Sequence, residues 1–465
     1  MSDARAPTIY VECTTTFRHD HGTGIPRVAN AIVRQLGALA PPHGYAVVPV
    51  YLDGSALRPA TLATDGGLGA PVEDRAAPPS RARRAMDGLA RAMPAGAARN
   101  FVAAPSSQPG LARLLRGASE RLRARPSALA VAAPGGVPGG VPIGTRDILL
   151  HADIHLGADY RALHAALHEQ GTPVCAVVYD LIPVRHPAIW PALPVRQFRE
   201  WLDRTIAGAD TLCAISEVVR DDLARYIAET PGLTRPRGQS IEWFHLGHDM
   251  DASRDHGPIR DSMRALFATD TPVLLCVGWL DPRKNQPRLI EAVATLQARG
   301  VTARLVLIGR RGFGTTEVMR ALDAVAGRAD VHLVDDASDA EVRHALEHSR
   351  ALVYPSYAEG FGLPLVEALR FRLPVLCSDI PIFREIAGPH AVYFDPFDVG
   401  SIVATLEAFL VRDDHPPRSL AEPFTWISWE DSVGLLLDLL LDARERATVN
   451  AGVQREAGEL APLSR

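Results

Sequence analysis

The sequence is almost without lysine. Its 465 residues carry 49 basic side chains, and Lys284 is the only lysine among them, so the other 48 are arginine. Because alanine, glycine and proline are abundant beside arginine, this imbalance indicates a coding bias that replaces ordinary surface lysines by arginines. A lysine that persists under such a bias is a candidate for a specific chemical role.

Other features are also scarce or missing. The net charge of −5 gives no overall attraction to nucleic acid, and we expect no nucleic-acid partner. The five cysteines form no CxxC pair, and most stand in apolar, strand-like runs, which predicts reduced, buried thiols rather than disulfides or structural zinc. The N-terminus lacks the layout of a signal peptide, and no apolar run reaches the roughly 18 to 20 residues that span a bilayer. These absences predict a cytoplasmic protein.

Short β-branched apolar runs alternate with longer helical patterns, which is typical of parallel sheets with crossover helices. The first half contains predicted strands at 8–13, 45–51, 147–151, 173–179, 210–214 and 240–245. The second half contains predicted strands at 272–278, 303–309, 331–334, 350–354, 374–378 and 391–394. Ser338 and Glu341 have capping-box spacing, which predicts a helix from there to about His348. We expect two doubly wound α/β domains joined near 250–270, with ligands in the cleft at the carboxyl ends of the strands.

Residues 52–145 interrupt this rhythm. They are rich in Ala, Pro, Gly and Arg, which predicts an insertion in the first domain. Within residues 81–125, ten arginines stand against two acidic residues, which gives this stretch a net charge of +8. Its helical pattern places four leucines on one face: Leu111, Leu114, Leu115 and Leu122. Two interpretations remain open, a peripheral helix attracted to anionic lipid on the inner face of the membrane, or a solvated or partly disordered segment whose leucines cover the domain.

The strongest candidate site is the segment VYPSYAEGFGLPLVEALRFRLPVLCSD. Gly360 and Gly362 let the backbone approach a ligand, and a helix starting at about Leu363 presents N–H groups that suit a phosphate. Glu359 and Glu367, with seven residues between them, offer acceptor-only oxygens that suit pairs of hydroxyls on a sugar or a ribose. Spacing alone leaves an equal alternative, namely a glycine-containing loop before a core helix with two solvated glutamates.

AEGFGLPLVEA resembles the E(x7)E motif of the retaining glycosyltransferases of family 4, whose two Rossmann-like domains form the GT-B arrangement. Further segments agree with that family in order and spacing: TGIPRV, VVYDLIPVRHP, AISEVVRDDL, HLGHD, VGWLDPRKNQ, LIGRRGFG and AVYFDPFD. The resemblance implies an acceptor-side domain over 1–250 that contains the insertion, and a nucleotide-sugar-binding domain over 258–424. It also implies that a C-terminal helix within 425–465 packs back on the first domain, followed by a tail.

The resemblance assigns roles to the glycine-containing segment. Glu359 and the backbone of the loop that follows it would hold the hydroxyls of the donor sugar. That loop consists of Gly360, Phe361 and Gly362. Leu363 would offer its amide to the diphosphate, and Glu367 would bind the nucleotide ribose.

The resemblance also implies a cationic part of the donor site. Arg283 and Lys284 would neutralise the diphosphate as it leaves, which makes them catalytic together with Glu359. Gly278 belongs to the turn before them, and Gly24 would bring the backbone of the first domain against the phosphates. Many relatives carry Arg after the glycine of that turn, where this chain has Trp279.

Tyr179 and Asp180 stand where many relatives carry a His-Asp pair near the sugar. Since tyrosine cannot act as a base at neutral pH, we assign both residues only to sugar or acceptor contacts, with an N-terminal turn residue as an equal alternative for Asp180. We expect no metal site, because the most suggestive histidines lack carboxylate or cysteine partners at ligand spacing. These histidines are His19, His21, His151 and His155.

These expectations describe a retaining, metal-independent glycosyltransferase that needs no cofactor. TGIPRV, DLIPVRHP and PRKN look most like bacterial mannosyltransferases that build surface polysaccharide, so we expect GDP-mannose as donor and a glycan or lipid-linked glycan as acceptor. The main alternative is a UDP- or dTDP-linked glucose or rhamnose. Two other classes remain, a nucleotide-binding scaffold without transfer and a pyridoxal-phosphate phosphorylase, which shares the fold and needs one lysine.

Overall fold

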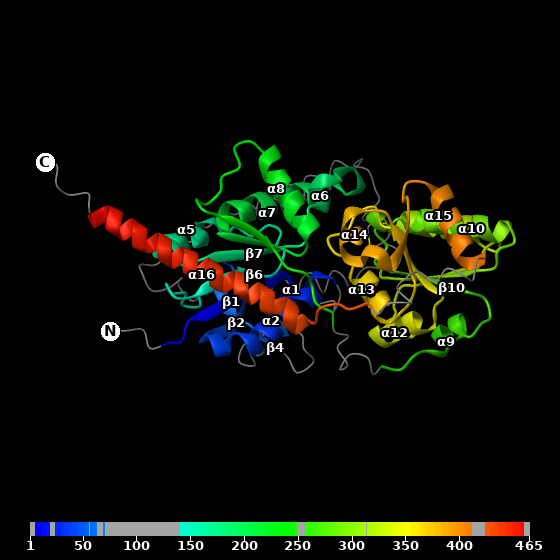
Figure 1. Ribbon diagram of the computed structural model, residues 1–465, viewed down its shortest axis with the longest axis horizontal. Coiled ribbons are helices and arrows are strands. Elements are labelled where there is room, and N and C mark those ends of the chain that lie inside the picture. Colours follow the sequence, from blue (N-terminus) through cyan, green and yellow to red (C-terminus); the bar gives the residue numbers. More distant parts are fainter. Residues whose placement is uncertain are drawn as a thin grey trace, which may run out of the picture.

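Two large, mostly parallel sheets organise the chain, one in each half (Figure 1). The computed structural model describes residues 5–18, 24–54, 56–62, 68–69, 140–248, 257–312, 314–411 and 424–459. The arginine-rich stretch 81–125 with its leucine face, and His19 and His21, lie outside the described residues.

The first sheet has seven strands in the order β3-β2-β1-β6-β7-β8-β9. They are β1 (Thr8–Glu12), β2 (Ala46–Asp53), β3 (Ala56–Pro59), β6 (Ile148–His151), β7 (Val174–Val178), β8 (Thr211–Ala214) and β9 (Ser240–Trp243). All pair in parallel except β3, which is antiparallel to β2. A separate pair joins β4 (Thr61–Leu62) and β5 (Leu68–Gly69). Every residue of β1, β6, β7 and β8 is buried, as expected when helices cover both faces of a parallel sheet.

The second sheet has six parallel strands in the order β12-β11-β10-β13-β14-β15. They are β10 (Val273–Val277), β11 (Arg304–Ile308), β12 (Val331–Val334), β13 (Ala351–Tyr354), β14 (Val375–Ser378) and β15 (Ala391–Phe394). All twelve predicted strands are therefore confirmed to within two residues at each end.

The beginning of the predicted insertion needs correction, because residues from 52 onward still belong to the first sheet. Strand β2 continues to Asp53, and β3 folds back on it with Asp53 opposite Ala56. Gly54 has a φ of 62°, which suits the tight turn between these two strands. At the other end of the segment, Val141 N–H donates to Leu57 O (2.9 Å). Strand β3 and Val141 are thus both tied to the first sheet.

Helices connect the strands and cover both sheets (Figure 1). The first domain contains α1 (Thr14–Arg18), α2 (Ile25–Leu39), η1 (Pro41–His43), α5 (Arg161–Gln170), α6 (Ile182–Arg185), η3 (Pro187–Ile189), α7 (Ala192–Gly208) and α8 (Glu217–Glu229). The second contains α9 (Asp261–Phe267), η4 (Pro282–Lys284), α10 (Gln286–Ala298), α11 (Thr315–Val325), α12 (Asp339–His348), α13 (Leu363–Arg370), α14 (Pro381–Ala387), η5 (Gly388–His390) and α15 (Val399–Val411). The predicted capping box is present at α12, between Ser338 and Glu341.

The final helix, α16 (Trp429–Glu459), returns to the first domain and packs against α2 and β8 (Figure 1). The segment that leads into it runs beside the end of the first domain: Trp426 Nε1 donates to Leu246 O (2.8 Å), and His248 N–H donates to Ile427 O (3.1 Å). A Cβ on Gly247 would lie 2.4 Å from Ser428 O, so glycine permits this close crossing. Among the described helices, none is both long and apolar enough to cross a bilayer.

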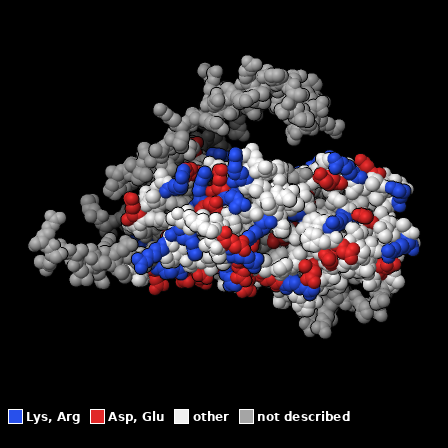
Figure 2. Space-filling model, turned by 90° about the horizontal axis from the view of Figure 1, so that it is seen from above, with Lys and Arg blue, Asp and Glu red and all other residues white. Residues whose placement is uncertain are grey.

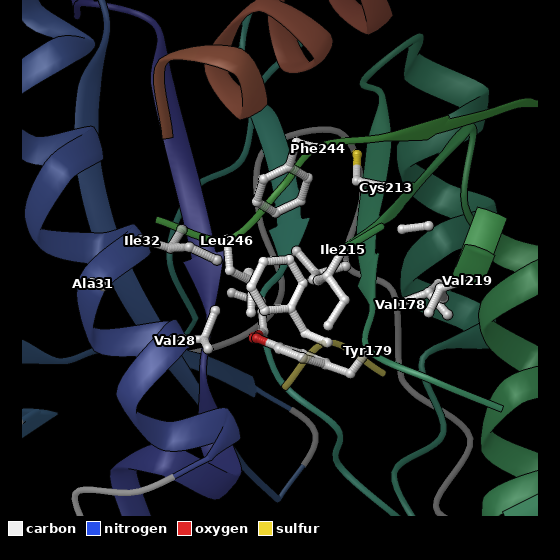
Figure 3. Close-up of a cluster of buried hydrophobic side chains, with 14 of the residues drawn as sticks. Val28, Ala31, Ile32, Val178, Tyr179, Cys213, Ile215, Val219, Phe244 and Leu246 are labelled. Carbon is white, nitrogen blue, oxygen red and sulfur yellow. The ribbon is translucent and has the colours of Figure 1, made fainter. Parts of the chain in front are cut away.

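Apolar side chains from several elements pack together in the first domain (Figure 3). Val28 and Ile32 of α2 contribute to the same buried cluster as Phe244 and Leu246, which follow β9. All five cysteines are buried, as predicted, and each is a free thiol in the structure. On the face shown in Figure 2, acidic and basic side chains are interspersed over the described part of the molecule.

Candidate active site

Glu359, on the loop after β13, lies at the centre of a buried charged cluster. One carboxylate oxygen accepts a hydrogen bond from Arg283 Nη1, and the other accepts from Lys284 Nζ (2.5 Å) and Ser356 Oγ (2.8 Å). Lys284 Nζ also donates to the hydroxyl of Tyr354 (2.6 Å). The side chains of Glu359 and Lys284 are only 6% and 8% exposed. Two cations therefore surround Glu359, and Arg283 Nε also lies 3.7 Å from the carboxylate of Asp281.

The charges in this cluster fix the protonation state of Glu359. Burial alone would raise its pKa, but Arg283 and Lys284 outweigh that effect and lower the pKa to about 2. Burial also lowers the pKa of Lys284, and the neighbouring Glu359 partly offsets this shift. Glu359 consequently stays ionised at physiological pH and serves as a hydrogen-bond acceptor rather than as a proton donor.

The loop after β10 places both cations. Asp281 accepts a hydrogen bond from the backbone N–H of Arg283 (3.0 Å), which caps the short helix η4. Gly278 lies against the lysine stem, since a Cβ on it would approach Lys284 Cε to 3.2 Å. Asn285 precedes α10, and its side-chain amide donates to Pro355 O (3.1 Å) and Pro396 O (3.0 Å) after β13 and β15. Three strand ends of the second sheet thus hold the cationic loop in place.

The glycines after Glu359 allow a close approach between the domains. A Cβ on Gly360 would lie 2.2 Å from the backbone oxygen of Tyr179, so glycine is needed where the second domain meets the first. Gly362 has a φ of 104° and directly precedes α13, which begins at Leu363. Phe361 is buried, with its ring 5.8 Å from that of Trp426 in an edge-on contact. The backbone is therefore the part of this loop that is suited to bind a ligand.

Glu367, in the second turn of α13, faces the first domain. Its Oε1 accepts a hydrogen bond from Arg27 Nη1 (2.6 Å) and lies 3.9 Å from His248 Nε2. Gly24 precedes α2 and has a φ of 62°, and a Cβ at that position would meet open space within 4 Å. The beginning of α2, with Gly24 and Arg27, thus lies on the side of the first domain that contacts α13.

Tyr179 and Asp180 differ in how they relate to this cluster. Tyr179 is 4% exposed, and its hydroxyl donates to Ala152 O (2.7 Å) within the apolar cluster of Figure 3. Its side chain is not brought to the site. Asp180 accepts a hydrogen bond from Ile182 N–H (3.0 Å), which is the geometry of a turn residue before α6. Burial raises the pKa of Asp180, and the charge of Arg283 opposes that shift.

A second buried polar cluster lies where β1 and β6 end in the first domain. Glu12 is bound by His151 Nδ1 (3.2 Å), and His151 Nε2 lies 2.9 Å from His164 Nε2. Asp153 accepts hydrogen bonds from two backbone N–H groups, and burial raises its pKa to about 6. The cluster borders a small cavity of about 20 Å³, together with His155. Within the described residues, no group of three or more His, Cys, Asp or Glu side chains could hold a metal ion.

Contacts between the domains include residues that the sequence did not single out. Glu385 of α14 accepts hydrogen bonds from the first N–H groups of α8, those of Glu217 and Val218 (both 2.9 Å). It also lies 2.6 Å from His245 Nε2. Like His248, His245 belongs to the HLGHD segment. The only sequence signal for these histidines was that HLGHD agrees with the family in its position along the chain.

Two doubly wound domains that face each other across a cleft define the GT-B fold. Sucrose-phosphate synthase from Thermosynechococcus elongatus has this fold and is similar to the chain with a TM-score of 0.54 and 14% identity, over 98% of this chain and 100% of that one. HepE from Anabaena, solved in complex with UDP and glucose, gives a TM-score of 0.51 and 13% identity, over 98% and 100%. Likenesses at this level of identity establish the fold alone, and they confirm the predicted GT-B architecture.

Sequence comparisons give more specific relatives. Residues 260–421 match the family model for glycosyl transferases group 1. The serotype-specific mannosyltransferase WbdA of Escherichia coli is 33% identical over 301 residues, which cover 63% of this chain and 36% of WbdA. O-antigen chain mannosyltransferase B of Escherichia coli is 30% identical over 162 residues, covering 34% of this chain and 42% of the relative. The chain therefore spans between one third and one half of the length of these relatives.

Proposed function

We propose that the chain is a retaining, metal-independent glycosyltransferase of family 4 that transfers mannose from GDP-mannose to a hydroxyl of a glycan or lipid-linked glycan in surface-polysaccharide synthesis. The observation that carries the proposal is the cluster in which Arg283 and Lys284 hold Glu359 beside the beginning of α13. It combines two fixed cations with an ionised acceptor for hydroxyls, as a sugar diphosphate requires.

The chemistry follows from charge. When the bond between the sugar and its phosphate breaks, negative charge grows on the departing diphosphate, and two fixed cations and a helix N-terminus stabilise that charge. The acceptor hydroxyl attacks from the face that the diphosphate leaves, and its proton passes to a phosphate oxygen. Glu359, with its pKa lowered to about 2, orients the sugar through its hydroxyls and takes no proton.

The choice of mannose rests on the relatives. Both relatives described above are named mannosyltransferases, and one is named for the O-antigen chain. Because the chain spans only part of their length, the donor and acceptor need a direct test.

That test is a thermal-shift screen with GDP-mannose, UDP-glucose and dTDP-rhamnose, followed by NMR of the product. A bound ligand stabilises the folded protein by an amount that grows with the ratio of its concentration to its dissociation constant. We expect a shift with GDP-mannose, an α-linked product, and loss of both in Glu359→Ala. Glu347→Ala, at a partly exposed glutamate paired with Arg343 on α12, is the matched control.

Each alternative has its own outcome. A shift with UDP-glucose but none with GDP-mannose would overturn the donor. Nucleotide binding without transfer to any glycan acceptor would favour a scaffold. Visible absorbance from protein-bound pyridoxal phosphate would favour a phosphorylase.

A further inference from the structure

Arg27 is a side chain of the first domain that contacts the carboxylate proposed to bind the ribose. It is the third residue of α2, and its Nη1 donates to Glu367 Oε1 at 2.6 Å. The Arg27 side chain is 30% exposed, whereas that of Glu367 is 8% exposed. This ion pair links two domains through residues 340 positions apart.

The same end of α2 is the one that the family resemblance assigns to the diphosphate, through the backbone at Gly24. The first turn of a helix presents N–H groups that its own carbonyls cannot accept, and these groups favour anions. Helix α2 begins directly after Gly24 and has 15 residues, so this end carries the dipole of a helix of about four turns. Arg27 thus belongs to the helix end that would face the phosphates, while its side chain reaches Glu367.

A second contact holds α13 against the first domain. Arg370, at the end of α13, donates through Nη1 to His248 O (2.7 Å), and His248 Nε2 lies 3.9 Å from Glu367 Oε1. Glu367 is therefore fixed by its own helix and by contacts from two segments of the first domain. These segments are the motifs TGIPRV and HLGHD. Both motifs agree with the family, and the donor site in the second domain does not explain that agreement.

We propose that Arg27 is a positioning residue that holds Glu367 for the nucleotide ribose and thereby makes tight donor binding depend on contact between the domains. This inference rests on the proposed function, since it takes Glu367 as the ribose ligand. A carboxylate has about four acceptor positions, so Glu367 can keep Arg27 at Oε1 and accept ribose hydroxyls at the same time. Arg27 acts through Glu367 and is not a catalytic residue.

The test measures binding of GDP by calorimetry, together with donor and acceptor kinetics, in Arg27→Ala, Arg27→Lys, Glu367→Ala and the double alanine variant. We expect Arg27→Ala to weaken GDP binding about 10- to 100-fold, as for a lost hydrogen bond to a charged group. The donor KM should rise while the acceptor KM changes less than about twofold. Arg27→Lys should restore part of the affinity, because it keeps the charge but not the planar fork.

The double variant separates coupling from coincidence. If Arg27 acts through Glu367, the double variant should bind GDP no more weakly than Glu367→Ala alone. The control is Arg220→Ala, since Arg220 has the same 30% side-chain exposure and an ion pair with Glu217 but lies on α8. It should bind GDP like the unaltered protein.

Several results would overturn the proposal. Arg27→Ala with unchanged or tighter GDP binding would mean that Arg27 is irrelevant or competes with the ribose, and additive losses in the double variant would mean that it acts elsewhere. If Arg27→Ala fails to fold, Arg27→Lys and Arg27→Gln decide by the same criteria. Normal GDP binding by Glu367→Ala would instead refute the ribose assignment of the proposed function, and absence of nucleotide binding by the unaltered protein would refute both.

Discussion

The two sheets end in buried carboxylates that are charged for different reasons. Glu359, after β13, is held by the permanent cation Arg283 and by Lys284. Glu12, the last residue of β1, is held instead by His151 and by the hydroxyl and backbone N–H of Thr14. Burial opposes ionisation at both glutamates, yet the pKa of each is lowered because its partners outweigh that effect.

The partners explain why only one cluster suits an anionic ligand. Around Glu359, Arg283 and Lys284 supply two fixed cations that a diphosphate could contact, and Asp281 lies 3.7 Å from Arg283 Nε. Around Glu12, the neighbouring imidazoles include His164, whose pKa burial lowers well below the ordinary value. A neutral imidazole supplies hydrogen bonds but no net charge. The same place in a parallel sheet therefore carries two fixed cations in one domain, whereas the carboxylate of Glu12 in the other is held by His151 and Thr14.

Glu359→Gln is expected to have the largest effect, because the buried Lys284 loses its carboxylate partner and Arg283 retains Asp281 at a longer distance of 3.7 Å. Removing one partner of a buried ion pair costs about 3 to 5 kcal/mol. Urea unfolding at pH 7 should show a loss of this size, and transferase activity should fall at least 100-fold. Glu12→Gln is the matched variant in the other cluster and should lose less stability, since its partners at this carboxylate include no permanent cation. Equal losses in the two variants would contradict the electrostatic distinction.

Asp153 should make the first domain respond to pH in the opposite sense from Glu359. Its folded pKa of about 6 lies above the ordinary value of 3.8, so its stabilising contribution is present below about pH 3.8 and is lost as the pH rises through 6. The difference between the folded pKa of about 6 and the ordinary 3.8 corresponds to up to about 3 kcal/mol. The unfolding free energy of the unaltered protein, relative to Asp153→Asn, should fall by up to this amount between pH 4 and pH 7.

The unfolding free energy of the unaltered protein relative to Glu359→Gln, measured in the same way, should change with pH in the opposite direction. Glu359 has a lowered pKa, so its contribution is present above about pH 4.5 and is lost as the pH falls toward 2. The prediction for Asp153 fails if the unfolding free energies of Asp153→Asn and the unaltered protein differ by a constant amount from pH 4 to pH 7. Asp153 would then have an ordinary pKa.

The sequence predicted local features well because their signals are local. Apolar strands separated by helical patterns indicated both sheets, and Glu359, Gly360 and Gly362 lie within one short motif. The pairing of Arg283 and Lys284 with Glu359 joins residues about 75 positions apart, and only the family resemblance brought these segments together.

Contacts between distant segments could not be predicted in the same way. Glu12 meets His151 because β1 and β6 are neighbours, although 139 positions separate the two residues. That adjacency depends on the order of the strands, which local patterns do not determine. The family resemblance assigned Tyr179 to sugar or acceptor contacts, because it stands where many relatives carry a histidine, but its hydroxyl is bonded inside the core. The pairing of Arg27 with Glu367 depends on how the two domains meet, which no single motif records.

Lys284→Arg is expected to have the smallest effect, and it tests whether the cluster needs a lysine or only a positive charge. The ammonium lies between the Tyr354 hydroxyl and Glu359, at 2.6 and 2.5 Å, and its stem packs on Gly278. A wider planar guanidinium must displace Tyr354, which is 1% exposed, or lose one of these bonds. We expect kcat/KM for the donor to fall about tenfold, or about 1.4 kcal/mol, while Arg320→Lys on the exposed face of α11 leaves it unchanged. Near-normal turnover of Lys284→Arg would mean that the single lysine is an accident of coding and that charge alone distinguishes this cluster from the one at Glu12.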